Sequence, residues 1–335
     1  MTVGDRDSVC VPMFETRCLL RRRSSLHCRV VSATPPHALG QASAAWPPVG
    51  GNMLSMSAVP ARVRLTSQVV ATKPGCAPLM KMYEAAVVAK PKSWTEVEEP
   101  FLRAMEQFDA NVASGLADMG DLQNGKGDFF NDLLALLLEN CAGVTLWSRG
   151  GVPGLIFPNH NLDVTFPSDG TVEFNLEAKT VGTPKHPGSP KAKPLGRRGS
   201  ADLDKRVKES GFKAIDLKAE YGRIAAQRGR SPDGGPGGGS LTTWLRQMKP
   251  SYFLFIAARV VSQSDFNAVM VKAGIASRVA DHVGIYCYTP VAEDKPTTYR
   301  TFPVKASAHE LDRILYEACQ DLTGLQARLS AASNP

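Results

Sequence analysis

Apolar residues recur every three to four positions in four segments of the chain, which is the spacing of one face of an α-helix. Capping and acidic residues open the first and third segments, as expected at helix N-termini. The second segment is apolar almost all round, which indicates a buried helix. Helices are therefore predicted at 93–119, 128–140, 200–229 and 306–329, and Gly211 could break the third.

Shorter apolar runs bounded by Gly, Pro, Asn and Asp are typical of strands. The sequence PSDG at 167–170 is a good hairpin turn, so the runs on its two sides should be antiparallel neighbours. Strands are predicted at 143–148, 154–157, 161–166, 171–180, 251–261 and 282–289. Their order among the helices predicts an α/β fold.

Residues 171–180 alternate cleanly between apolar and polar positions. The polar face carries two carboxylates, an amide and an ammonium: Glu173, Asn175, Glu177 and Lys179. Asp163 lies on the neighbouring predicted strand, from which its side chain can reach Glu177 and Lys179. The pattern favours a functional site at Glu177 and Lys179 over a solvated strand edge. Glu173 and Asn175 could either support this site or simply face solvent.

The predicted helix at 128–140 carries three acids on one narrow stripe, at intervals of four and seven: Asp128, Asp132 and Glu139. Because a buried charge is costly, any of these that are buried should be paired or hold a metal. The alternative is that Asp128 is a helix N-terminal charge and that Glu139 reaches water near the end of the helix.

Two carboxylates brought together need a counter-charge, and oxygen ligands open to solvent are what Mg²⁺ binds. Asp163 and Glu177 are the candidate metal ligands. Lys179 beside them would orient or polarise an attacking water and offset charge that builds up on a phosphate.

The order Asp163, hairpin, then Glu177-Ala178-Lys179 fourteen residues further on resembles the PD-(D/E)xK nucleases, the superfamily that contains most Type II restriction endonucleases. The resemblance covers about residues 125–290, and Leu162 stands where that family often has Pro. It implies an αβββαβ core with a mixed central sheet flanked by helices. It also implies a Mg²⁺-dependent endonuclease acting on double-stranded DNA in restriction-modification defence, with Glu139 or Asp132 assisting, 5′-phosphate products and a homodimer.

Two other functions are kept as alternatives. His160, Asn175 and His186 have spacings near those of an HNH nuclease, but strict alternation at 171–180 and the prolines around His186 fit that motif less well. A DNA repair protein or a DNA-binding module on the same fold, without efficient cleavage, is the second alternative.

The formal net charge of +7 is concentrated in one segment. Residues 183–230 hold thirteen Lys or Arg against five Asp or Glu, a local balance of +8, which predicts a polyanionic partner. A solvated helix face with a basic loop is the plainer interpretation. Seven residues are candidate contacts to the DNA backbone: Lys185, Lys191, Lys193, Arg197, Arg198, Lys205 and Arg206.

Residues 1–75 lack steady periodicity and contain few acids, so little packed structure is expected there, and one nuclease domain is predicted at 76–335. A disordered or spurious extension, with a true start at Met53 or Met80, is favoured over a transit peptide or a basic arm that contacts nucleic acid.

Seven scattered cysteines without a CxxC pair argue against a zinc ribbon and suit a reducing bacterial cytoplasm, with Cys141 and Cys287 packing as small apolar residues. No apolar run has the roughly 20 residues of a membrane span.

Overall fold

Among the residues that the structure describes, seven strands hydrogen-bond side by side in the order in which they follow one another along the chain. The computed structural model describes residues 58–63, 77–185, 195–227, 245, 248–304 and 307–333. The strands are β1 (Ala58–Pro60), β2 (Trp147–Val152), β3 (His160–Phe166), β4 (Phe174–Val181), β5 (Ser251–Arg259), β6 (His282–Ala292) and β7 (Lys295–Phe302). Strands β1 to β4 are antiparallel neighbours, β4, β5 and β6 run parallel, and β7 returns antiparallel to β6. The fold is α/β with a mixed sheet, as the sequence predicts.

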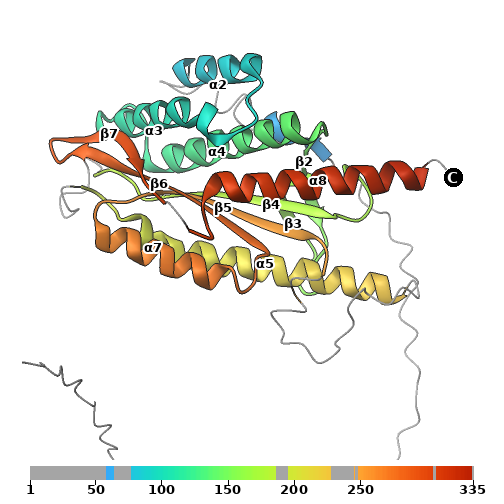
Figure 1. The fold of residues 1–335 in the computed structure, drawn as a ribbon. Coiled ribbons are helices and arrows are strands. Elements are labelled where there is room, and N and C mark those ends of the chain that lie inside the picture. The colour runs from blue at the N-terminus through green and yellow to red at the C-terminus, as the bar shows by residue number, and fades with distance from the viewer. Residues whose placement is uncertain are drawn as a thin grey trace, which may run out of the picture. The chain divides into compact units, whose positions relative to one another are not determined.

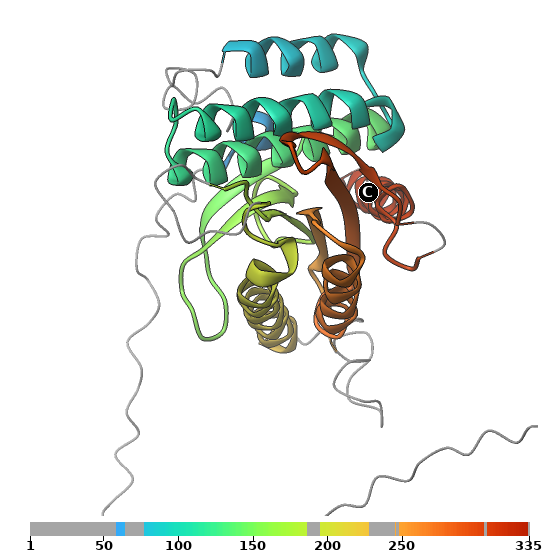
Figure 2. The same cartoon turned by 90° about the vertical axis from the view of Figure 1, so that its left-hand side faces the viewer.

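Helices cover both faces of the sheet (Figures 1 and 2). One face is covered by α3 (Glu98–Ala113), α4 (Met119–Ala142) and α8 (Leu311–Ser333), and α2 (Ala77–Ala89) stacks outside α3 and α4. The opposite face is covered by α5 (Gly199–Gln227) and α7 (Gln263–Ala276), which lie side by side. Short 3-10 helices stand at η1 (Ala61–Val63) and η2 (Trp94–Glu96).

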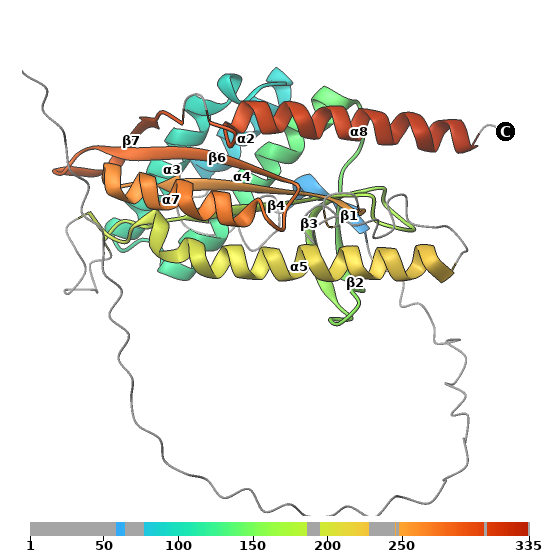
Figure 3. The same ribbon diagram turned by 60° about the horizontal axis from the view of Figure 1, so that its bottom comes forward.

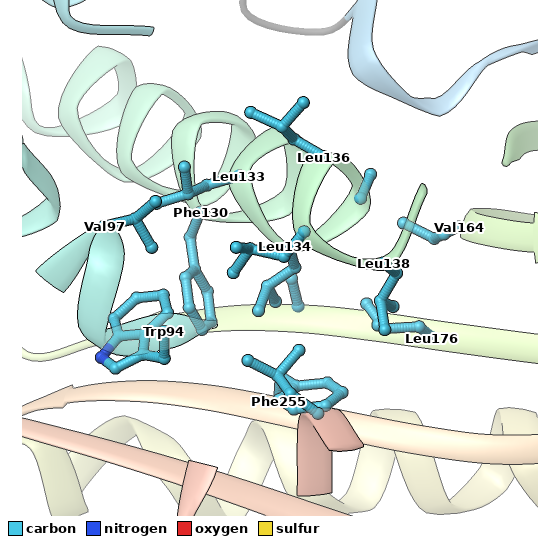
Figure 4. Packing of buried hydrophobic residues seen from close by; sticks show 14 of the residues in the cluster. Trp94, Val97, Phe130, Leu133, Leu134, Leu136, Leu138, Val164, Leu176 and Phe255 are labelled. Carbon is cyan, nitrogen blue, oxygen red and sulfur yellow. The ribbon is translucent and has the colours of Figure 1, made fainter. Parts of the chain in front are cut away.

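The apolar faces of α4 and β4 meet in the larger of two hydrophobic cores. Phe130 and Leu134 of α4 pack toward Leu176 of β4 and Phe255 of β5 (Figure 4). The second core lies under α5 and α7. Because β5 contributes side chains to both cores, nearly all of its residues are apolar. Each face of the sheet therefore has its own buried layer.

The predicted helices are present, although their bounds differ. The prediction at 93–119 corresponds to η2 and α3, and that at 128–140 lies within the longer α4. The third helix, α5, continues through Gly211 without a break. Helix α7 and strand β7 were not predicted. The helical spacing of apolar residues is weak in α7, and the alternation of apolar and polar residues is weak in β7.

Two strand predictions need correction. The strand expected at 143–148 begins only at Trp147, and the run 154–157 is a loop and not a strand. In addition, β1 and η1 lie inside the segment 1–75, where little packed structure was expected, and Ala61 of η1 is fully buried. This part of the segment belongs to the sheet. Within the residues described, no helix combines the length and apolarity needed to cross a bilayer.

Cys141 at the end of α4 forms a disulfide with Cys319 of α8. The prediction that Cys141 packs as a free apolar thiol is therefore wrong. Cys287 is a buried free thiol, as predicted. The bond joins residues 178 positions apart in the sequence. It ties the C-terminal helix to the helix that carries the main core.

We expect Cys141→Ser/Cys319→Ser to lower the free energy of unfolding by about 2–4 kcal/mol, because the cross-link limits the freedom of the unfolded chain. Urea unfolding of the oxidised protein measures this loss. The wild type in dithiothreitol should match the double variant, and the variant should not respond to the reductant. A wild type that unfolds at the same urea concentration with and without dithiothreitol would contradict the cross-link.

Candidate functional site

Five side chains from four elements form a cluster beneath α5. Lys179 of β4 and Lys213 of α5 both bind Oε1 of Glu177, with Nζ to Oε1 distances of 2.6 and 3.1 Å. Tyr252 of β5 donates its hydroxyl to the other oxygen, Oε2. Asp163 of β3 approaches Lys179, with 3.8 Å between Oδ2 and Nζ. The structure thus brings together the three residues that the sequence predicts and adds Lys213 and Tyr252.

Strand register explains how the cluster forms. Strands β3 and β4 pair from Phe166 opposite Phe174 to Val164 opposite Leu176, so Asp163 and Glu177 stand one position beyond the end of this register. Parallel pairing of β4 with β5 sets Tyr252 beside Asn175, two residues before Glu177 on the same face of the strand. The confirmed hairpin therefore places an acid of each strand at one point.

The cluster is buried at one end and open to solvent at the other. Glu177 is 2% exposed, whereas the side chains of Asp163 and Lys179 are 16% and 19% exposed. Burial opposes ionisation of Glu177, but the ammonium groups of Lys179 and Lys213 and the hydrogen bonds from Lys179 and Tyr252 outweigh it and lower its pKa to about 2. Burial next to this carboxylate raises the pKa of Tyr252 well above its ordinary value. Glu177 is therefore a fixed anion at neutral pH.

Asp163 and Glu177 are the residues of the cluster that could hold a metal ion. Asp163 and Glu177 offer carboxylate oxygens from two strands, and Mg²⁺ is commonly held by one or two carboxylates with water and phosphate oxygens completing its shell. Among the described residues no group of three or more His, Cys, Asp or Glu gathers as a metal site. For Glu177 to bind a cation through Oε1, Lys179 or Lys213 has to move away from that oxygen.

The two helical acids expected to assist are placed elsewhere. Oε1 of Glu139 accepts the backbone N–H of Leu146, its Oε2 pairs with Arg62, and Asp132 is fully buried beside Asn131. Both acids belong to α4, which packs on the apolar face of β4, whereas Glu177 contacts α5 on the opposite face. The structure does not bring Glu139 or Asp132 to the cluster.

Candidate DNA contacts line the surface between the end of β4 and the first turns of α5. Lys185, Arg197, Arg198 and Lys205 are exposed and Arg206 is partly exposed, while Lys191 and Lys193 lie outside the described residues. Three of these cations have acidic neighbours on α5: Arg197 pairs with Asp202, and Lys205 and Arg206 with Glu209.

Sequence reasoning missed the roles of Tyr252 and Lys213. Tyr252 reads as a core residue in an apolar strand, and Lys213 as one cation of a basic helix. A buried Tyr hydroxyl needs a partner, and this requirement is the signal that could have pointed to Tyr252. Its partner comes from a strand 75 residues away in the sequence.

His160, the first histidine of the alternative HNH motif, is bound to a carboxylate inside the protein. His160 is 4% exposed, and its Nε2 lies 2.8 Å from Oδ2 of Asp216 on α5. Asn175 is buried within β4, and His186 lies outside the described residues. His160 and Asn175 are therefore not arranged at a strand-to-helix turn as the HNH motif requires.

Asp216 also holds the β2–β3 connection. The backbone N–H groups of Ile156 and Phe157 donate to its two carboxylate oxygens at 2.7 and 2.9 Å. Burial opposes ionisation of Asp216. The hydrogen bonds from Ile156, Phe157 and His160 outweigh this effect and lower the pKa of Asp216 below its ordinary value.

Tyr252→Phe should destabilise the protein by about 2–3 kcal/mol, because one oxygen of a buried carboxylate loses its hydrogen-bond donor. The matched control is Thr165→Val, which removes a fully buried hydroxyl that donates to the uncharged backbone carbonyl of Trp147 at 2.9 Å, and which should cost about 1 kcal/mol. Urea unfolding at pH 7 compares the two. Equal losses would mean that the charge of Glu177 adds nothing to the bond.

Asp216→Asn tests the anchor of the loop through its pH dependence. Because the folded-state pKa is lowered, the ionised carboxylate stabilises the protein above its unfolded-state pKa of about 3.9, and this contribution disappears as pH falls through the folded value. The variant should be about 2 kcal/mol less stable at pH 7, with the gap closing below about pH 4. Thermal unfolding between pH 3 and 7 measures it, and a gap independent of pH would refute the assignment.

Comparison with protein-family models, with curated proteins and with solved structures finds no match for this chain. Function is therefore inferred from the residues and their geometry.

Proposed function

We propose that the chain is a Mg²⁺-dependent endonuclease that hydrolyses phosphodiester bonds of double-stranded DNA. The observation that carries this proposal is the position of Lys179 Nζ between two carboxylates of adjacent strands, 2.6 Å from Glu177 and 3.8 Å from Asp163. A cation next to paired acids at a partly open site is suited to phosphodiester hydrolysis, because the acids can hold a metal and the cation offsets charge on the phosphate.

The order of elements supports the same proposal. Helix α4, strands β2, β3 and β4, helix α5 and strand β5 follow one another as αβββαβ, with Asp163 on the second of these strands and Glu177 and Lys179 on the third. This order and these positions agree with a PD-(D/E)xK core. We include a restriction-endonuclease-like core, with two copies acting on a symmetric DNA site, in the proposal.

Each residue of the cluster has a defined task in this mechanism. Asp163 and Glu177 would hold Mg²⁺, which supplies Lewis acidity at the phosphate and a more acidic water. Tyr252 and Lys213 keep Glu177 ionised and in place. Lys179 orients the water that attacks phosphorus and offsets charge on the phosphate. As the water oxygen bonds to phosphorus it releases a proton to solvent, the bond between phosphorus and the 3′ oxygen breaks, and the 3′ oxygen takes up a proton from solvent.

A DNA-binding module without cleavage is the second candidate, and one observation favours it. Both oxygens of Glu177 already accept strong donors, from Lys179, Lys213 and Tyr252. If these bonds persisted on DNA, Glu177 could not serve as a metal ligand, and the cluster would only stabilise the fold.

Cleavage of supercoiled plasmid decides between the two candidates. With Mg²⁺ the wild type should nick and linearise the DNA, EDTA should abolish this, and Lys179→Ala should lower the rate by about 10²-fold or more. The control is Lys81→Ala, which removes an exposed lysine of α2, on the side of the sheet opposite α5, and should cut at the wild-type rate. Absence of metal-dependent nicking, or undiminished nicking by Lys179→Ala, would reject the proposed hydrolysis.

A further inference from the structure

The connection between β2 and β3 exposes three consecutive large apolar side chains. Leu155, Ile156 and Phe157, which we call the apolar tip, are 51%, 74% and 48% exposed. Figures 2 and 3 show this connection projecting away from the sheet beside α5. Contiguous exposed apolar residues on a soluble domain commonly mark an interaction site.

The tip is held in a fixed shape and does not merely lie exposed on a loose loop. Asp216 accepts the backbone N–H groups of Ile156 and Phe157, its own carbonyl accepts that of Leu155, and Gly154 donates to the carbonyl of Phe157. A Cβ at Gly154 would lie 2.1 Å from Asp216 Oδ2, so only glycine lets the loop approach this carboxylate. The fold therefore holds three apolar side chains in water in a preformed arrangement.

The apolar surface continues onto α5 and there meets a row of lysines. Phe212 and Ile215 are 47% and 39% exposed. Lys205 and Lys208 precede them on the same exposed stripe, because the spacing 205, 208, 212 and 215 is helical. Residues 195–213 carry six Lys or Arg and three Asp or Glu, a local balance of +3. A partner of this surface should thus offer both negative charge and an apolar surface.

The tip adjoins the candidate catalytic cluster. The ring of Phe157 lies 5.1 Å from that of His160, which lies 6.2 Å from that of Phe212. Lys213, the next residue, donates to Glu177 and also to the carbonyl of Asn161 at the start of β3. A polymer whose phosphate reached Lys179 would therefore have the tip against its neighbouring nucleotides.

We propose that the apolar tip inserts between base pairs of duplex DNA as a wedge, an inference that rests on the proposed function. Phosphates would face Lys205, Lys208 and the cluster, while Ile156 and Phe157 enter the stack. Apolar wedges of this kind unstack one base step and kink the duplex, and burying the exposed side chains offsets the cost of unstacking. Duplex DNA is favoured over a second copy of the chain because the tip borders the lysines and the phosphate site.

Unwinding of a relaxed closed plasmid tests the wedge without cleavage. The full-length protein is bound in EDTA, a metal-independent type IB topoisomerase relaxes the DNA, and the linking number is measured after protein removal. Wild type should lower the linking number in proportion to bound protein. Ile156→Ala/Phe157→Ala should bind the plasmid roughly tenfold more weakly and, at equal occupancy, leave the linking number unchanged.

Val88→Ala/Tyr316→Ala is the matched control, since it removes two exposed side chains, 83% and 65% exposed, from helices on the other side of the sheet. It should unwind DNA as the wild type does. Unwinding by the tip variant at the wild-type level overturns the wedge. If, in addition, sedimentation shows that the wild type is a dimer and the tip variant a monomer, the tip binds a second copy of the chain and not DNA.

Comparison with the Mg²⁺ cleavage assay separates the two proposals. A protein that unwinds plasmid but never cuts it refutes the hydrolysis and keeps the wedge. A protein that cuts without unwinding refutes the wedge alone, and a protein that does not bind DNA refutes both.

Discussion

The buried carboxylate of Glu177 needs compensating charge, and this requirement joins three elements of the fold. A carboxylate 2% exposed to solvent is stable only when donors surround it, and here Lys179 comes from β4, Lys213 from α5 and Tyr252 from β5. The helix is therefore held over the two parallel strands by charge as well as by apolar packing. Removing any of these partners would leave a buried charge less satisfied, so the cluster stabilises the fold that positions it.

Alternation along β4 divides the work between the two faces of the sheet. Phe174 and Leu176 pack under α4 in the larger core, and Asn175 and Glu177 point toward α5. A shift of register by one residue would exchange these faces and bury the acids under α4, where apolar side chains surround them. The hydrophobic core on one side thus fixes the geometry of the candidate site on the other.

Local pattern was enough to predict β4, the hairpin and the meeting of Asp163, Glu177 and Lys179, because a two-residue period and a tight turn determine which residues face each other. It failed where the outcome depends on contacts between distant segments. The acids of α4 repeat at helical spacing, but that spacing does not say on which face of the sheet the helix packs, so Glu139 was expected near the site and instead binds Leu146. The apolar run 154–157 resembles a strand, yet Asp216, about 60 residues later, takes up its N–H groups.

Helix α5 connects the loop anchor and the candidate site mechanically. Lys213 and Asp216 are three residues apart and lie on the same side of the helix, where Lys213 contacts Glu177 and Asn161 and Asp216 contacts Phe157 and His160. Any movement of α5 that draws Lys213 away from Glu177 also moves the carboxylate that shapes the apolar tip. One turn of α5 therefore carries both the lysine that binds the buried carboxylate of the candidate site and the aspartate that shapes the apolar tip.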